Sequence, residues 1–99
     1  MFGRKRRDAW VFLKGRDGRS PVGATVRLVE RRVSRQAGLE RNAGGAYAWT
    51  IFPETPHGAY TVLVTYPSGA EQTGRLVVDA SAHSVTLDEP ATTPSKERG

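Results

Sequence analysis

The feature of this chain that most restricts its fold is the alternation of apolar and polar residues over short runs. The runs are rich in β-branched and aromatic residues, and clusters of Gly, Pro, Asn and Ser separate them. Alternation with a period of two is typical of strands that bury one face, whereas an amphipathic helix repeats its apolar residues every three or four positions. No segment shows the helical spacing, so the sequence predicts a chain built from strands.

The expected strands are residues 10–14, 24–33, 46–52, 59–66, 71–79 and 83–88. Asp17 and Gly18 suit a tight turn after the first strand, because both residue types tolerate positive φ. Pro53 is expected to end the third strand, and residues 34–42 form the least defined connection. Six to seven strands at this spacing predict an all-β fold, an antiparallel two-sheet sandwich.

The two ends of the chain differ in composition from its middle. Residues 1–8 have no large apolar side chains besides those of Met1 and Phe2, and residues 89–99 hold only proline and alanine as apolar residues. Segments of this kind do not bury enough apolar surface to offset the entropy lost on ordering. We therefore expect a flexible basic arm over residues 1–8, one sandwich domain over residues 9–88 and a disordered tail over residues 89–99.

The chain of 99 residues has no cysteine, so its stability has to come from packing without disulfides. Large aromatic side chains are the natural anchors for such a core. The candidates are Trp10, Phe12, Tyr47, Trp49, Phe52 and Tyr60. Because these side chains stand at alternating positions typical of a core, we expect no exposed aromatic platform for stacking bases.

The basic residues are unevenly distributed along the chain. The formal net charge is +5, and residues 42–88 contain a single arginine. Twelve of the fifteen basic residues are arginine, a bias that a GC-rich genome produces without any function. The alternative is an anionic partner, which a flexible basic tract recognises through charge. That tract consists of Arg4, Lys5, Arg6 and Arg7.

The N-terminal segment lacks the features of a secretion signal. The apolar run after the basic tract covers only residues 9–13, shorter than the roughly 7 to 15 residues of a signal peptide. No run reaches the roughly 18 to 20 apolar residues of a membrane-spanning helix. A cytoplasmic protein with no membrane span is the default expectation, with leaderless export and assembly into a particle as open alternatives.

Three stretches of the sequence are similar to one family of sandwich domains. The pattern Gly-x-Asp-Gly-x-x-Pro-Val-Gly-Ala-x-Val-x-Leu of residues 15–28 resembles the first hairpin of carboxypeptidase-regulatory-like domains. Residues 42–50 look like that family's Gly-x-Tyr-x-Phe strand, and residues 56–64 look like its Pro-x-Gly-x-Tyr-x-Val-x-Val strand. These domains belong with the transthyretin-like (prealbumin-like) and collagen-adhesin B-type folds, so the resemblance implies an Ig-like or prealbumin-like sandwich.

This chain lacks the residues that the reactions known in this group of folds require. An internal isopeptide bond needs an acid between a first-strand lysine and a last-strand Asn or Asp; Lys14 and Asp88 supply the ends, but residues 60–66 hold no carboxylate. Transthyretin-like hydrolases need a histidine on an early strand, whereas His57 lies in a turn and His83 opens the last strand. We interpret both histidines as solvated, and predict no catalytic residue, no metal site and no cofactor.

The leading hypothesis is a non-catalytic module that binds another protein, a glycan or a second copy of itself through edge strands and loops. The expected partner surface lies on the 24–33 strand and the connection after it, at Arg27, Val29, Arg31 and Arg35. The alternative is a small basic protein that binds nucleic acid or another polyanion through its N-terminal arm.

Overall fold

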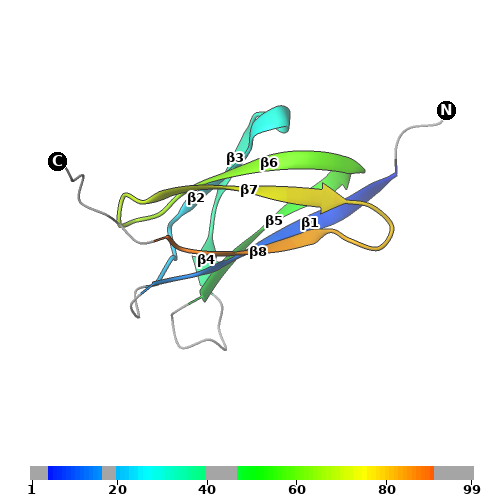
Figure 1. Cartoon of the computed structure of the whole chain (residues 1–99). Helices are drawn as coiled ribbons and strands as arrows, with labels where there is room; N and C mark the ends of the chain where they lie inside the picture. The colour runs from blue at the N-terminus through cyan, green and yellow to red at the C-terminus, as the bar shows by residue number, and fades with distance from the viewer. Residues whose placement is uncertain (1–4, 17–19, 40–46, 91–99) are drawn as a thin grey trace.

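The chain folds into two β-sheets (Figure 1), as a computed structural model that describes residues 5–16, 20–39 and 47–90. The elements are β1 (Arg6–Lys14), β2 (Thr25–Leu28), the 3₁₀ turn η1 (Val29–Arg31), β3 (Val33–Gln36), β4 (Gly38–Leu39), β5 (Tyr47–Pro56), β6 (Gly58–Thr65), β7 (Glu71–Val78) and β8 (Ser84–Asp88). One sheet has the strand order β4-β5-β1-β8 and the other β3-β2-β6-β7. The predicted all-β, two-sheet architecture is confirmed, with eight strands in the described residues, of which β4 is the shortest at two residues.

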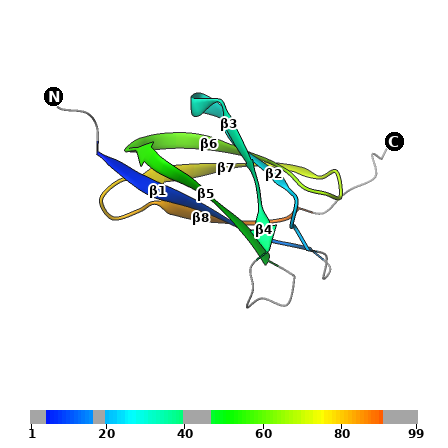
Figure 2. The ribbon, with the colours of Figure 1, turned by 180° about the vertical axis from the view of Figure 1, so that it is seen from behind.

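One strand pair is parallel, which corrects the expectation of a purely antiparallel arrangement. β8 lies beside β1 with both strands running in the same direction, so that Trp10 is opposite Ser84 and Lys14 is opposite Asp88. β8 reaches this position beside β1 because the short connection after β7 carries the chain from one sheet to the other (Figure 2). Side-chain and backbone donors of Ser81 and the backbone of Ala82 hold this connection through Asp79 Oδ1 at 2.7–3.1 Å.

The prediction of a single strand over residues 24–33 is wrong, because the chain reverses its direction within this range. β2 ends at Leu28, η1 follows, and β3 returns antiparallel to β2 with Val33 opposite Leu28. Arg32 makes the reversal with a left-handed backbone at φ 53°, a conformation that the sequence does not signal because no Gly, Asn or Asp stands there. The Glu30 carboxylate fixes the turn to β6 by accepting hydrogen bonds from the Thr61 backbone N–H at 2.7 Å and hydroxyl at 2.8 Å.

Pro53 does not end the third expected strand, since β5 continues to Pro56 through a bulge. The register with β1 shifts there, and Glu54 takes a left-handed backbone at φ 53°. Asp8 Oδ1 accepts a hydrogen bond from the Glu54 N–H at 3.2 Å, and the Thr55 hydroxyl donates to the Phe52 carbonyl at 2.7 Å. These bonds satisfy groups that the bulge removes from the ladder, so the strand survives the proline.

Both boundaries of the folded region differ from those expected. β1 begins at Arg6, and its first residues pair with the end of β5, so part of the expected arm is strand. At the other end Glu89 is buried: its carboxylate accepts hydrogen bonds from the Ser68 hydroxyl at 2.6 Å and from the Arg16 N–H at 3.3 Å. Glu89 therefore ties the end of β8 to two loops. Residues 1–4 and 91–99 lie outside the described residues.

The core between the sheets consists mainly of aliphatic side chains. It includes Val11, Leu13, Val26, Leu28, Val62, Val64, Leu76 and Val78, all at most 1% exposed. Phe52 and Tyr60 are buried, as predicted, and so is Tyr66. The other four expected anchors (Trp10, Phe12, Tyr47 and Trp49) are only half-buried, which contradicts the prediction that all the aromatic candidates fill the core.

The reason for this difference lies in β1 and β5, where both faces of each strand carry apolar residues. On β1 the smaller residues Ala9, Val11 and Leu13 face the interior, and Trp10 and Phe12 between them face outward. On β5 Ala48, Thr50 and Phe52 are the buried set, leaving the alternate residues outside. An alternation of two apolar sets does not tell which set is buried.

Tyr66 is expected to make the protein less stable in alkaline solution. Its ring is buried, its hydroxyl donates to Gln72 Oε1 at 2.5 Å, and burial together with the nearby Glu89 and Asp88 carboxylates raises its pKa far above 10. In the unfolded chain the phenol ionises near pH 10, so stability is complete below that pH and falls as the pH rises above it. Urea unfolding between pH 8 and 11 should show the free energy of unfolding decreasing with pH, and Tyr66→Phe should make this decrease less steep. An equally steep decrease in Tyr66→Phe contradicts the assignment of the pH dependence to Tyr66.

Candidate functional site

The four residues expected to form one partner surface are divided by the β2–β3 turn. Arg27 lies on the outer face of its sheet, with its Nη1 3.4 Å from Ser34 Oγ, whereas Val29 and Arg31 lie in the turn itself. Arg35 stands opposite the buried Val26, on the inward side of β3. Since β2 lies between β3 and β6, it offers no free edge, and the predicted surface on this strand is not assembled.

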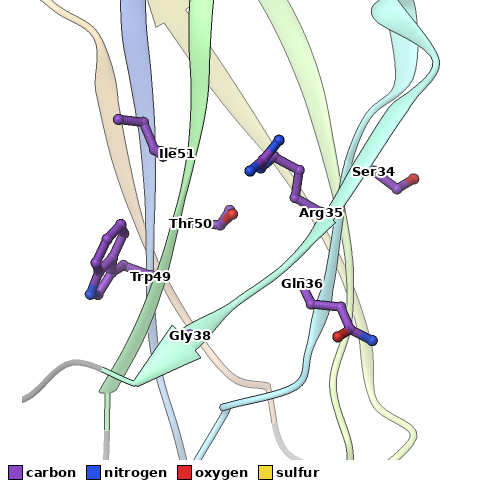
Figure 3. Close-up of a pocket in the computed structure, with 7 residues that line it drawn as sticks. All are labelled: Ser34, Arg35, Gln36, Gly38, Trp49, Thr50 and Ile51. Carbon is purple, nitrogen blue, oxygen red and sulfur yellow. The ribbon is translucent and has the colours of Figure 1, made fainter.

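Arg35 lies in a groove between β3 and β5 (Figure 3). The groove is lined by Ser34, Arg35, Gln36, Gly38, Trp49, Thr50 and Ile51. Arg35 and Thr50 point into the space between the two strands, while Trp49 and Ile51 point away from it. A charge that points inward from an edge strand opposes further strand pairing, and Pro53 with its bulge does the same on β5. This side of the molecule is therefore protected against β-addition.

The basic tract at the N-terminus is partly built into the fold. Arg6 and Arg7 pair with Pro56 and Thr55 of β5, and Arg6 Nη1 lies 3.4 Å from the Glu54 carbonyl. The hollow beside them has mixed charge and is lined by Arg6, Arg7, Asp8, Trp10, Glu54 and His83. Lys5 is exposed, and Arg4 lies outside the described residues. Polyanion binding by this tract stays a prediction.

β7 is the longest strand at an edge of either sheet. All eight of its residues pair with β6 without a register shift, and within the described chain no strand pairs with its other side. It contains neither proline nor a bulge. Its outward side chains are Glu71, Thr73, Arg75 and Val77, all exposed. A regular strand with an unpaired side is a template for another strand.

A second unpartnered surface is the outer side of the β4-β5-β1-β8 sheet. We call it the aromatic face, and it consists of Trp10, Phe12, Tyr47, Trp49 and Ile51. The Trp10 and Phe12 rings are parallel within 5° at 5.8 Å, and the Trp10 and Trp49 rings lie 5.2 Å apart. The cross-strand register places Ile51 opposite Trp10 and Trp49 opposite Phe12, so the side chains form one contiguous cluster. No described strand or turn covers it.

The two histidines are less solvated than expected. His57 and His83 are half-buried, and one nitrogen of each ring, Nε2 of His57 and Nδ1 of His83, is buried without a hydrogen-bond partner among the described residues. Within the same residues there is no group of three His, Asp or Glu side chains placed to hold a metal ion. The described part of the chain also contains no helix of the length and apolarity needed to cross a bilayer.

Comparison with known proteins does not assign this chain to a family. No family model matches it, and no curated protein matches it. The similarity to carboxypeptidase-regulatory-like domains therefore stays a prediction from its motifs. Two of the stretches that carry it are partly outside the described residues, at 17–19 and 42–46.

Sequence reasoning missed both unpartnered surfaces. The aromatic face has a signal in residues 9–13 and 47–52, where apolar residues occupy consecutive positions and so must appear on both faces of a strand. The β7 edge has no such signal, because the order of strands in a sheet depends on contacts between distant parts of the chain.

Proposed function

We propose that this chain is a non-catalytic β-sandwich module, of the Ig-like or prealbumin-like type, that assembles by adding a second strand to β7. The partner we propose is a second copy of the same chain. The observation that carries the proposal is the free side of β7, eight regular residues long and lacking the devices that protect the other edges. β3 carries the inward Arg35, β4 has two residues, and the Asp88 carbonyl of β8 is occupied by the Gln72 side chain at 2.7 Å.

The charges on β7 suit antiparallel pairing of the strand with itself. When the two-fold axis passes through Thr73, Glu71 of one copy stands opposite Arg75 of the other, and the same pair repeats on the far side of the axis. Opposite charges directly across an antiparallel pair stabilise it, whereas like charges destabilise it. An interface between identical strands requires such self-complementarity, and Glu71 and Arg75 are equally spaced about Thr73.

A charge exchange tests this arrangement. Arg75→Glu places two glutamates opposite each other at both positions and is expected to abolish self-association, measured by sedimentation velocity from low to high micromolar concentration. Glu71→Arg combined with Arg75→Glu restores opposite charges across the axis and is expected to restore association. Glu30 has a pKa that is lowered mainly by its hydrogen bonds to Thr61 and, to a smaller extent, by the charge of Arg75. The double variant keeps any repulsion between a glutamate at position 75 and Glu30, so its recovery separates the intermolecular effect from a local one.

Exposed Val77 provides the matched control, since Val77→Thr changes the same strand outside the two charged pairs. It is expected to associate like the unchanged protein. A chain that stays monomeric throughout the concentration range contradicts the proposal. So does a double variant that remains as monomeric as Arg75→Glu.

A further inference from the structure

The aromatic face has polar groups aligned along one side of its rings. β8 runs parallel to β1, and its outward residues Ser84, Thr86 and Asp88 are exposed. The register places Ser84 opposite Trp10 and Thr86 opposite Phe12, so that each ring on β1 has a hydroxyl group on the neighbouring strand. The face thus presents apolar rings and hydrogen-bonding groups in parallel rows.

The charges around the aromatic face are balanced. At one end Lys14 lies opposite Asp88, and the Lys14 ammonium stands 5.9 Å from the centre of the Tyr47 ring. At the other end Arg6 and Arg7 share a hollow with Asp8 and Glu54. Proteins that bind single-stranded nucleic acid combine stacking rings with an excess of positive charge along the backbone track. Among the described residues this face lacks that excess, which favours an uncharged ligand.

The size of the aromatic face suits a small ligand better than a protein. From the Trp10 row to the Lys14 row is four residues, or about 14 Å at ~3.4 Å per residue, and β5 to β8 spans two strand spacings, or about 10 Å. The resulting area, on the order of 200 Å² with its margins, is well below the roughly 800 Å² that each partner buries in a stable protein–protein interface. A linear chain of a few sugar rings has these dimensions.

We propose that the aromatic face binds a neutral oligosaccharide. The C–H side of a pyranose ring is flat and apolar and packs on Trp and Phe rings, while its hydroxyl groups point sideways, where Ser84 and Thr86 donate and accept hydrogen bonds. Lys14 and Asp88 extend the polar row at the end of the sheet. This site lies on the sheet that does not contain β7, so it is independent of the proposed self-association.

The test is isothermal titration of the full chain with neutral hexasaccharides of glucose, xylose and N-acetylglucosamine in different linkages. Binding of at least one, with a dissociation constant between about 10 μM and 1 mM, is expected, together with a change in tryptophan emission. Trp49→Ala and Trp10→Ala should each weaken that binding at least tenfold. Thr25→Ala, at an exposed position of β2 on the opposite sheet, should leave it unchanged and serves as the matched control.

Heparin and a dT oligonucleotide are titrated in parallel as charged probes. Binding of either polyanion that Trp49→Ala weakens, without binding of any neutral hexasaccharide, overturns the proposal in favour of a polyanion site. The absence of binding to every hexasaccharide at 5 mM overturns it as well. Loss of self-association in Trp49→Ala would show instead that the face is covered by a second copy, and would also contradict pairing through β7.

Discussion

Replacing Arg27 with proline is expected to lower the free energy of unfolding strongly. Arg27 lies within β2, which pairs with β3 on one side and with β6 on the other. Proline has no N–H for either ladder, and its ring does not fit between two paired strands. We expect a loss of at least about 3 kcal/mol, a large part of the 5–15 kcal/mol that stabilises a typical domain.

Arg27→Ala is the matched control, because it removes the same side chain and keeps the N–H. Its expected cost is below about 1 kcal/mol, since the bond from Arg27 to Ser34 is long and exposed. Urea unfolding followed by circular dichroism measures both variants. If Arg27→Pro were no less stable than Arg27→Ala, residue 27 would lie on a free edge, the position that the sequence alone predicts.

Phe52→Ala is expected to destabilise the protein by about 3–5 kcal/mol, while Trp49→Ala costs about 1 kcal/mol although tryptophan is the larger residue. Phe52 is 3% exposed and belongs to the core, so its removal leaves a cavity. Trp49 is half-buried on the outer face, and its removal exposes part of Trp10 to water without opening a hole.

Thermal unfolding distinguishes these two variants clearly. For a domain of this size each kcal/mol corresponds to roughly 4–8 °C in melting temperature, so Phe52→Ala should melt at least about 10 °C below Trp49→Ala. Leu13→Ala, which truncates a fully buried side chain on β1, should resemble Phe52→Ala. Equal losses in Phe52→Ala and Trp49→Ala would mean that Trp49 is a core residue.

The parts of the fold that the sequence predicts are those set by local signals. The alternation of apolar and polar residues predicts the ends of β6, β7 and β8 to within one or two residues, because each strand turns one face toward the core and is bounded by turn residues. The β2–β3 turn escapes prediction because its left-handed residue is Arg32, stabilised by the contact between Glu30 and the distant Thr61. β5 passes Pro53 for a similar reason, since Asp8 on another strand supports the bulge.

The candidate surfaces depend on strand order and on the choice of buried face, and the sequence does not determine either one locally. Arg27 and Arg35 are eight positions apart, yet β2 is internal and β3 is at an edge, so the two arginines have different surroundings. In β1 the buried set Ala9, Val11 and Leu13 is no more apolar in pattern than Trp10 and Phe12. The space between the sheets accepts the smaller set, and that space exists only in the folded chain.

Tryptophan fluorescence tests the central claim, that the large aromatic side chains of β1 and β5 face outward, most directly. The chain has two tryptophans, and both belong to the aromatic face, so the emission reports on this surface alone. In the folded protein we predict red-shifted tryptophan emission, and a rate constant for quenching by acrylamide that is a substantial fraction of the rate constant in the unfolded chain. Blue-shifted emission with almost no quenching in the folded monomer would contradict the account, because both rings would then lie inside the core.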